Sequence, residues 1–487
     1  MNWGSSITYL GETSVKNAST VFGIKDADRL QHIALVGKMG SGRANFLTQV
    51  ALQDVERGIG TVLLDGVGNF VQTFLERLPK DAEERVIVLD PSDGEHPYSW
   101  NPLDDFRALA HEYAFSPLSD MLASVYQVSR GPLVEFVARY MLQAENATLL
   151  HLYELVSDPK ARERLLPSAE AKSEFEALLK DAGDTATLIH ENGRYLAKDS
   201  LMRNILGQPT SKFTLDVLEK GGIVIVDFSR IRMFPTRITG LVRLFVHLAR
   251  LHSTENIPLA LYMQDCVRYL SVEDLDKALF DRGLMLTVSD TSHGEEEKTL
   301  REKALQRSGT VIAFTPHEMD EPLVNHVFYP YVSPEEFEKL HEGEFVIALT
   351  IDSVRSKPFF GSVLPLPARS GLSHQDVQLY SRNLYTLQRV KVDEMFRPKK
   401  DDTEKGKDGE PGSFSDAFRS IFTKQAGAGK DGKATGAAPV AAAAKPEPKA
   451  VPEKKDVKGG TPVPPAEIPE DKLKKMLHVR KISKKKN

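Results

Sequence analysis

The sequence predicts an α/β protein built on a mostly parallel β-sheet, and three observations lead to this fold class. Short apolar runs rich in β-branched residues alternate with stretches of helical periodicity, the pattern of parallel strands joined by helices that cover both faces. The first such run enters a glycine-rich loop that opens an amphipathic stretch. From Arg397 onward large apolar residues almost vanish, so we expect a disordered tail.

Eight apolar runs are expected as buried strands: 32–37, 61–66, 85–91, 222–228, 259–265, 284–290, 309–315 and 344–352. A helix over about 45–58 should follow the glycine loop. Between roughly Phe106 and Gly207 the periodicity becomes helical throughout, which indicates an all-α insertion. The expected domains are therefore two parts of one core at 1–105 and 208–396, the insertion at 106–207, and the tail at 397–487.

Composition and targeting signals favour a cytoplasmic protein. The chain has 487 residues, of which 41% are apolar and 27% charged, enough to bury more than one core. No apolar run approaches the ~18–20 residues that span a bilayer, and the N-terminus lacks the layout of a signal peptide. A single cysteine, Cys266, excludes an intrachain disulfide framework and suits a reducing compartment.

The formal charge of -5 hides an asymmetry between body and tail. Residues 397–487 carry a net charge of +9 and residues 1–396 a net charge of -14. An acidic body argues against a self-sufficient nucleic-acid surface, because affinity for phosphates comes largely from cations. The basic tail could touch DNA or acidic lipid, and its segments 413–422 and 471–487 could dock on a partner as short helices. A solvated tail is the alternative interpretation.

The glycine-rich loop, GKMGSGRA, has the spacing of a phosphate-binding loop, G-x-x-x-x-G-K-[ST]. Its glycines keep the backbone freedom that such a nest of N–H groups requires. Arg43 stands where lysine should reach the phosphates, and Ala44 stands where a hydroxyl should bind Mg²⁺. The candidate phosphate-binding residues are Gly37, Lys38, Met39, Gly40, Ser41, Gly42, Arg43 and Ala44.

A metal carboxylate should end a later strand, and LALYMQDC is the candidate. Gln264 takes the expected position of the metal-binding aspartate, and Asp265 that of the following glutamate. Glutamine is a weak Mg²⁺ ligand, since the ion prefers anionic oxygen. A shift of one residue would let Asp265 bind the metal, and Asp65 also ends a strand, so these two carboxylates are the remaining metal candidates.

Taken together, several stretches resemble the additional-strand P-loop ATPases of type IV secretion and conjugation, the TraG/TraD-like coupling proteins, in a form without a membrane segment. The resemblance spans about residues 5–370, and VLDPSDGEHPYSWNPL and NILGQPTSKF are its most distinctive parts. It implies a RecA-like core, an all-α insertion, a ring of subunits, and ATP-driven movement of DNA or protein through a secretion or pilus apparatus.

Compared with that family, the chain departs at each catalytic position. The family's lysine and hydroxyl become Arg43 and Ala44, and its paired acidic residues become Gln264 and Asp265. The glutamine that senses γ-phosphate corresponds to Thr291, and the arginine that reaches a neighbour's nucleotide corresponds to Thr315. An arginine finger alone is worth ~10³–10⁵ in rate. The resemblance therefore implies a degenerate member, with no catalytic residue assigned.

Three hypotheses follow from these features. The first is a pseudo-ATPase that acts as an assembly or substrate-adaptor subunit, in a ring with copies of itself or with a related ATPase, at the periphery of a membrane secretion complex. The second is a divergent ATPase that uses Arg43 on the phosphates and Asp65 or Asp265 for metal. The third is a switch that binds ATP or ADP without turnover. The sequence assigns no cofactor outright: it leaves ATP or ADP open and argues against Mg²⁺.

Overall fold

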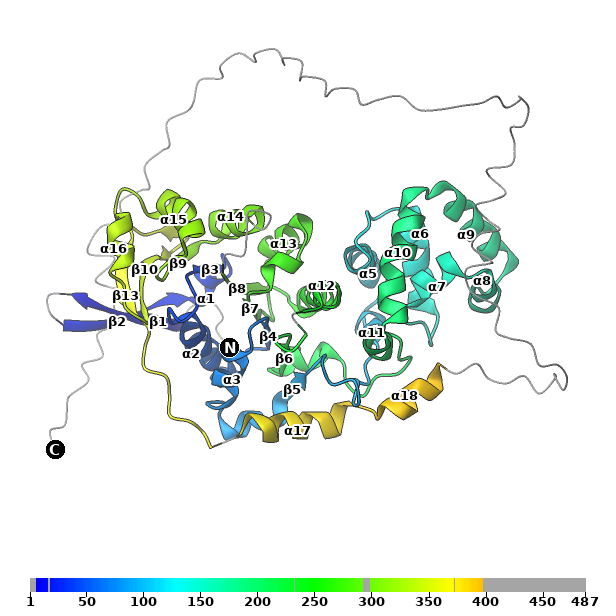
Figure 1. Ribbon diagram of the computed structural model, residues 1–487, viewed down its shortest axis with the longest axis horizontal. Helices are drawn as coiled ribbons and strands as arrows, with labels where there is room; N and C mark the ends of the chain where they lie inside the picture. The colour runs from blue at the N-terminus through cyan, green and yellow to red at the C-terminus, as the bar shows by residue number, and fades with distance from the viewer. Residues whose placement is uncertain (1–5, 16–17, 232, 292–297, 372, 397–487) are drawn as a thin grey trace, which may run out of the picture. The chain divides into compact units, whose positions relative to one another are not determined.

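The computed structural model describes residues 6–15, 18–231, 233–291, 298–371 and 373–396. These residues fold around one 11-stranded sheet with the strand order β2-β1-β13-β10-β9-β3-β8-β7-β4-β6-β5 (Figure 1). Residues 397–487, which include the predicted tail and its two docking segments, lie outside the described residues.

The centre and one side of the sheet are parallel, as predicted. Its parallel strands are β9 (Thr310–Ala313), β3 (Ile33–Val36), β8 (Leu284–Asp290), β7 (Leu259–Gln264), β4 (Thr61–Asp65), β6 (Ile223–Asp227) and β5 (Val86–Leu89). The other side is antiparallel and consists of β10 (Glu344–Ala348), β13 (Phe359–Ser362), β1 (Ile7–Val15) and β2 (Ala18–Lys25). A separate hairpin pairs β11 (Thr350–Ile351) with β12 (Val354–Arg355). Each of the eight predicted strands is present.

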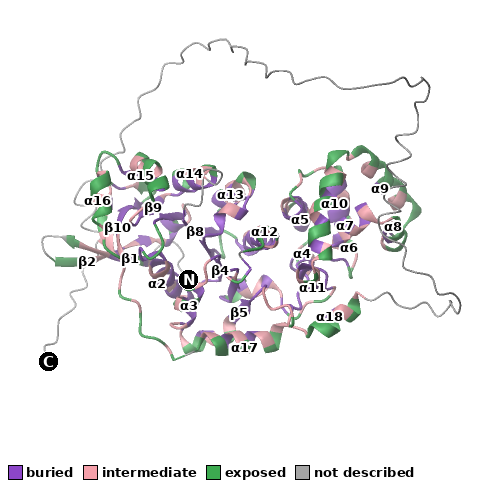
Figure 2. Cartoon of the chain, viewed as in Figure 1, coloured by how far each residue is buried: buried purple, intermediate pink, exposed green. Residues whose placement is uncertain are grey.

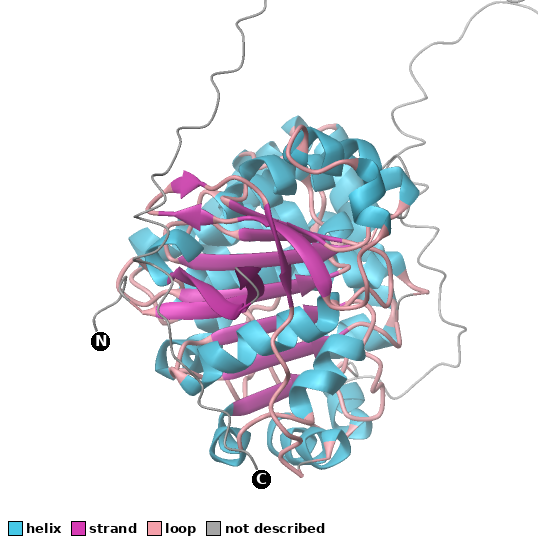
Figure 3. Cartoon of the chain, turned by 90° about the vertical axis from the view of Figure 1, so that its left-hand side faces the viewer, coloured by secondary structure: helices cyan, strands magenta, loops and turns pink. Residues whose placement is uncertain are grey.

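Helices cover both faces of the sheet (Figure 3). The strand β3 shows why: Ala34 and Val36 enter one apolar cluster, whereas Ile33 and Leu35 enter the other, because successive side chains of a strand point to opposite faces. The parallel strands β9, β3, β8, β7 and β4 are therefore buried along their whole length (Figure 2). The second cluster is covered by α2 (Arg43–Glu56) and α3 (Asn69–Leu75). Helices that contribute to the first include α12 (Pro235–His252), α13 (Val272–Leu279), α14 (Lys298–Arg307), α15 (Glu321–Phe328) and α16 (Pro334–Glu338).

Between β5 and β6 the chain is helical, which agrees with the predicted helical periodicity. The helices are α4 (Leu103–Arg107), α5 (His111–Val125), α6 (Pro132–Gln143), α7 (His151–Ser157), α8 (Pro159–Leu165), α9 (Ala169–Asp181), α10 (Asp184–Lys198) and α11 (Ser200–Leu206). The bounds 106–207 for an independent insertion domain stay a prediction.

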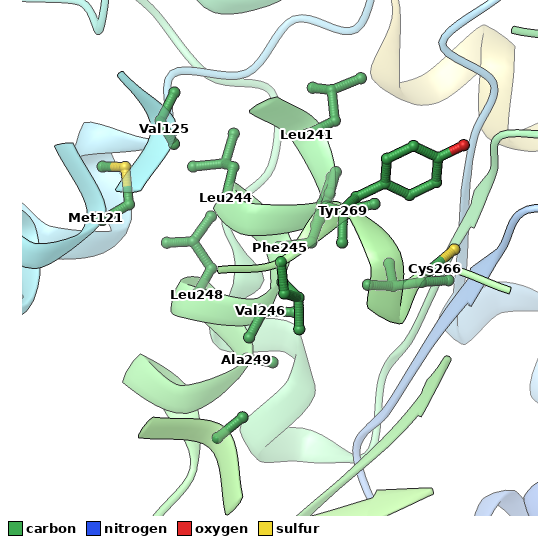
Figure 4. Close-up of a cluster of buried hydrophobic side chains, with 14 of the residues drawn as sticks. Met121, Val125, Leu241, Leu244, Phe245, Val246, Leu248, Ala249, Cys266 and Tyr269 are labelled. Carbon is green, nitrogen blue, oxygen red and sulfur yellow. The ribbon is translucent and has the colours of Figure 1, made fainter. Parts of the chain in front are cut away.

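The helix α12 joins these helices to the core. Figure 4 shows Leu244 and Leu248 of α12 extending toward Met121 and Val125 of α5, all of them buried. On the side of α12 near the turn that follows β7, the same cluster contains Cys266. This cysteine is buried and forms no disulfide.

Two C-terminal helices, α17 (His374–Tyr385) and α18 (Arg389–Met395), were not predicted. The hydroxyl of Ser381 on α17 donates to the carbonyl of Val88 at 3.1 Å and accepts from its N–H at 2.8 Å. One side chain therefore satisfies both free backbone groups of a residue in the edge strand β5. Over the described part of the chain, no helix has the length and apolarity to cross a bilayer.

Candidate nucleotide site at the glycine-rich loop

The glycine-rich loop connects β3 to α2, as the sequence predicts for a phosphate-binding loop. Its first turn is fixed to the neighbouring strand end, because the Lys38 N–H donates to the carbonyl of Thr315 at 2.9 Å. Its second half is held by the N–H of Gly343, which donates to the carbonyl of Ser41 at 3.0 Å. The loop is therefore clamped between the ends of β9 and β10, and Thr315 takes part through its backbone.

Two of the loop glycines are needed for its conformation. Gly40 has a φ of 77° and Gly42 a φ of 107°, a region that residues with a Cβ rarely adopt. A Cβ on Gly42 would also lie 2.8 Å from the backbone of Gly343. No side chain caps α2 at Gly42, so the N–H groups of its first turn can receive an anion.

Arg43 extends away from the loop into the strand ends. Its Nη1 donates to the hydroxyl of Ser289 at 2.8 Å and its Nη2 donates to the hydroxyl of Thr291. The same Nη2 lies 3.7 Å from Oδ2 of Asp265. These four residues are buried. The side chain that should hold phosphate in an active loop is thus anchored at the ends of β7 and β8.

Asp265 occupies a strained turn directly after β7. Its φ is 52°, in the left-handed region that an aspartate tolerates better than most residues. Its Oδ1 accepts from the N–H of Thr291 at 2.5 Å, and its Oδ2 has no hydrogen-bond partner among the described residues. Within the described part of the chain, Arg43 is the cation that pairs with Oδ2.

The other metal candidate, Asp65, acts as a cap for the following helix. Its Oδ1 accepts from the N–H of Val67 at 2.8 Å and its Oδ2 accepts from the N–H of Val71 at 3.0 Å. Complete burial raises the pKa of this carboxyl to about 6, although these hydrogen bonds oppose the shift. Both oxygens are committed to the backbone at the start of α3.

Gln264 takes the position at which the family's metal-binding aspartate was expected. Its Nε2 donates to Oδ1 of Asn69 at 2.7 Å, and its Oε1 is buried without a hydrogen bond in the described residues. Acidic groups nevertheless gather nearby. Burial raises the pKa of the Cys266 thiol well above its ordinary value, and the neighbouring carboxylates of Asp65, Asp265 and Asp290 raise it further. The charge of Arg268 opposes these carboxylates.

A cavity of about 150 Å³ lies against the loop. Besides loop residues, its lining includes Arg43, Gln264, Asp265 and Glu342. The volume is below the ~300–1,000 Å³ of pockets that enclose drug-sized ligands. It is large enough for a phosphate group, while two carboxylates in its wall oppose an anion.

The structure brings the predicted positions together with some that sequence reasoning missed. Thr291 lies at the loop, where its hydroxyl accepts from Arg43. The side chain of Thr315 instead donates to the carbonyl of Leu340 at 3.2 Å. Ser289 and Glu342 were not predicted. Ser289 is the penultimate residue of the apolar strand β8, and this position near a strand end was the available signal.

The donor set fits a phosphate better than it fits Mg²⁺. Magnesium takes six oxygen ligands in octahedral geometry and favours carboxylates and phosphates. Here Ala44 offers no oxygen, Asp65 is occupied by backbone N–H groups, and Asp265 faces a guanidinium. Within the described ranges no cluster of three or more acidic, histidine or cysteine side chains could hold a metal ion.

A family model that includes this loop matches part of the chain. Residues 18–177 match the family model described as the type IV secretion-system coupling protein DNA-binding domain. Over these residues the chain is similar to a coupling protein of type IV secretion. No curated protein gives a significant match to the sequence.

Solved structures similar to the coupling-protein-like chain include the bacterial conjugative coupling protein TrwBdeltaN70 in complex with sulphate, at 14% identity and a TM-score of 0.46, covering 72% of this chain and 88% of that one. TrwB in complex with the non-hydrolysable ATP analogue ADPNP is 14% identical, with a TM-score of 0.45 and coverages of 72% and 88%. VirB4 of Thermoanaerobacter pseudethanolicus is 12% identical, with a TM-score of 0.46 and coverages of 75% and 98%.

Proposed function

We propose that this coupling-protein-like chain is a non-hydrolysing subunit of a type IV secretion or pilus machine, and that it serves in assembly or in presenting substrate. The observation that supports this most is the absence of a Mg²⁺ ligand set at the described strand ends around the loop. Phosphoryl transfer depends on a metal that bridges the phosphates and neutralises their developing charge. A site that cannot position the metal loses that contribution.

The same observations rank the two alternatives. A divergent ATPase would need Asp65 or Asp265 at the metal, yet Asp65 caps α3 and Asp265 pairs with Arg43. A switch without turnover is favoured by the conformation of the loop, in which Gly40 and Gly42 hold backbone N–H groups open at the start of α2. The switch is therefore the second candidate, with ATP or ADP as its ligand.

The proposed setting is a ring at the cytoplasmic periphery of a membrane secretion complex, made of copies of this chain or shared with a related active ATPase. DNA is a candidate partner because the matched family model is that of a DNA-binding domain. The basic residues of 397–487 are the candidate contact, since the rest of the chain is acidic.

Turnover by the full chain tests the proposal. Phosphate release from ATP with Mg²⁺ is measured with and without DNA, beside the Arg43→Ala variant. We expect the two proteins to show the same background rate. Release that the wild-type protein supports and the variant does not would overturn the proposal, because it would assign the activity to this loop and not to a contaminant.

A further inference from the structure

Arg43 stands at the position of the lysine of an active loop and also supplies a cation at the neighbouring strand ends. Its guanidinium lies among two hydroxyls and one carboxylate at the ends of β7 and β8. We infer that Arg43 is a tethered cation that serves this site in place of a metal ion, so that the loop binds a metal-free phosphate, such as that of ADP, in competition with Asp265. The inference rests on the proposed function and specifies its ligand.

The carboxylate of Asp265 holds Arg43 in its observed position. Its Oδ2 is buried, lies 3.7 Å from Arg43 Nη2 and has no hydrogen bond within the described residues. If Arg43 moved to a phosphate, this carboxylate would remain in the protein interior without its counter-charge, which is costly. The strained backbone of Asp265 also fixes the carboxylate in place, since the residue follows directly on β7.

Arg43 nevertheless keeps a donor for a ligand. Its Nε is buried and has no acceptor among the described residues, while Nη1 and Nη2 are occupied. Arg43 lines the 150 Å³ cavity beside the loop, together with Lys38 and Asp265. A phosphate in this cavity would meet the buried cation of Arg43 and the free N–H groups at the start of α2. Lys38 adds a second cation to the lining, and the carboxylates of Asp265 and Glu342 oppose the phosphate. The cation is already part of the protein, so the phosphate needs no metal.

Removing the opposing carboxylate should therefore strengthen phosphate binding. In Asp265→Asn the amide oxygen can still accept from the N–H of Thr291, while the charge that competes for Arg43 is lost. We expect the Kd for ADP in the presence of EDTA to fall at least about tenfold, on the scale set by a buried charge and its partner. Arg43→Ala should lose binding in either background.

The matched control is Asp227→Asn. Asp227 ends β6, beside β4, and its Oδ1 accepts from the N–H of Ser229 at 2.9 Å. This variant removes the same charge from another strand end and leaves the contacts of Arg43 intact. Its Kd for ADP should stay within about twofold of the wild-type value, because a charge without a direct contact is screened.

Calorimetric titration of the full-length protein and these variants with ADP, with EDTA or with Mg²⁺, decides the inference. Tighter binding by Asp265→Asn alone, with no gain from Mg²⁺, supports it. Equal Kd values for Asp265→Asn and wild type, no binding by either at millimolar ADP, or a tenfold gain from Mg²⁺ in the wild type would overturn it. None of these results involves turnover, so the proposed function can fail or stand separately.

If Asp265→Asn does not fold, as judged by its circular dichroism, Ser289→Ala replaces it. This variant removes one neutral acceptor of Arg43 and loosens its anchorage. We then expect about a threefold lower Kd for ADP, the scale of one hydrogen bond. An unchanged Kd would count against the tethered cation.

Discussion

Replacement of Asp65 by asparagine tests whether this carboxyl is a buried helix cap. Burial raises its pKa from 3.8 to about 6 in the folded chain. Between these two values the folded protein binds a proton that the unfolded chain has released, so stability falls as pH rises. Above pH 6 both states are ionised and the loss is constant. The native carboxylate thus lowers the free energy of unfolding at neutral pH.

The size of this effect follows from the same two values. About two pH units at about 1.4 kcal/mol each give about 3 kcal/mol, on an order-of-magnitude scale. Asparagine cannot ionise and is free of this cost. Its Oδ1 can accept from the N–H of Val67, but its NH₂ group faces the N–H of Val71, which costs about 1–3 kcal/mol. At neutral pH the gain from removing the ionisation cost and the loss of the hydrogen bond to Val71 nearly cancel. The ionisation cost changes with pH and the hydrogen-bond loss does not, so the difference in stability between the two proteins depends on pH.

Urea unfolding of wild type and Asp65→Asn between pH 4.5 and 7.5 measures this difference. The free energy of unfolding of the variant should gain about 2 kcal/mol relative to wild type over that range, most of it below pH 6. The denaturant slope m must agree between the two proteins for the comparison to hold. If the difference in the free energy of unfolding between the two proteins did not change with pH, the assignment of Asp65 as a buried cap with a raised pKa would be refuted.

Three further changes probe the fold by urea unfolding. Ser381→Ala should lower the free energy of unfolding by about 1–3 kcal/mol, since two backbone groups of β5 lose their partner; no loss would mean that water replaces the hydroxyl. Gly42→Ala should lower the free energy of unfolding more than Gly40→Ala does. Both glycines have a positive φ, but only at Gly42 would a Cβ lie against the backbone of another residue. Equal losses of stability would contradict the clamped loop. Asp54→Asn should cost about 3–5 kcal/mol by leaving Arg29 buried without its bidentate partner, and a cost below 1 kcal/mol would contradict that pairing.

The sheet could be predicted where burial on both faces leaves a continuous apolar run. All eight such runs form strands within one or a few residues of their expected bounds. The antiparallel side was missed because its strands are partly exposed. β2 alternates buried and half-buried residues only toward its end, and β1 pairs with it across an irregularity between Tyr9 and Gly11. Such strands owe their conformation to pairing more than to composition.

The loop of the candidate site could be predicted from the sequence, but the hydrogen bonds that connect it to distant strands could not. The spacing of GKMGSGRA correctly placed the loop between strand and helix. The direction of Arg43 depends on Ser289 and Thr291, which lie 246 and 248 residues away in the chain. Such a partnership needs the strand order, and a motif at one point of the chain does not contain it. Asp65 differs, because its two carboxylate oxygens accept from N–H groups only two and six residues further along the chain.

The hydroxyl of Ser381 has a consequence for how copies of this chain can associate. With β5 covered by α17 at one border, strand addition to the 11-stranded sheet of the described residues is left to β2, which pairs within this sheet with β1. A sheet with one open edge can pair through that edge with only one other copy. The resulting dimer has no free sheet edge, so strand addition cannot extend it into a fibre. Within the described residues, an assembly of more than two copies would therefore not grow by strand addition to this sheet.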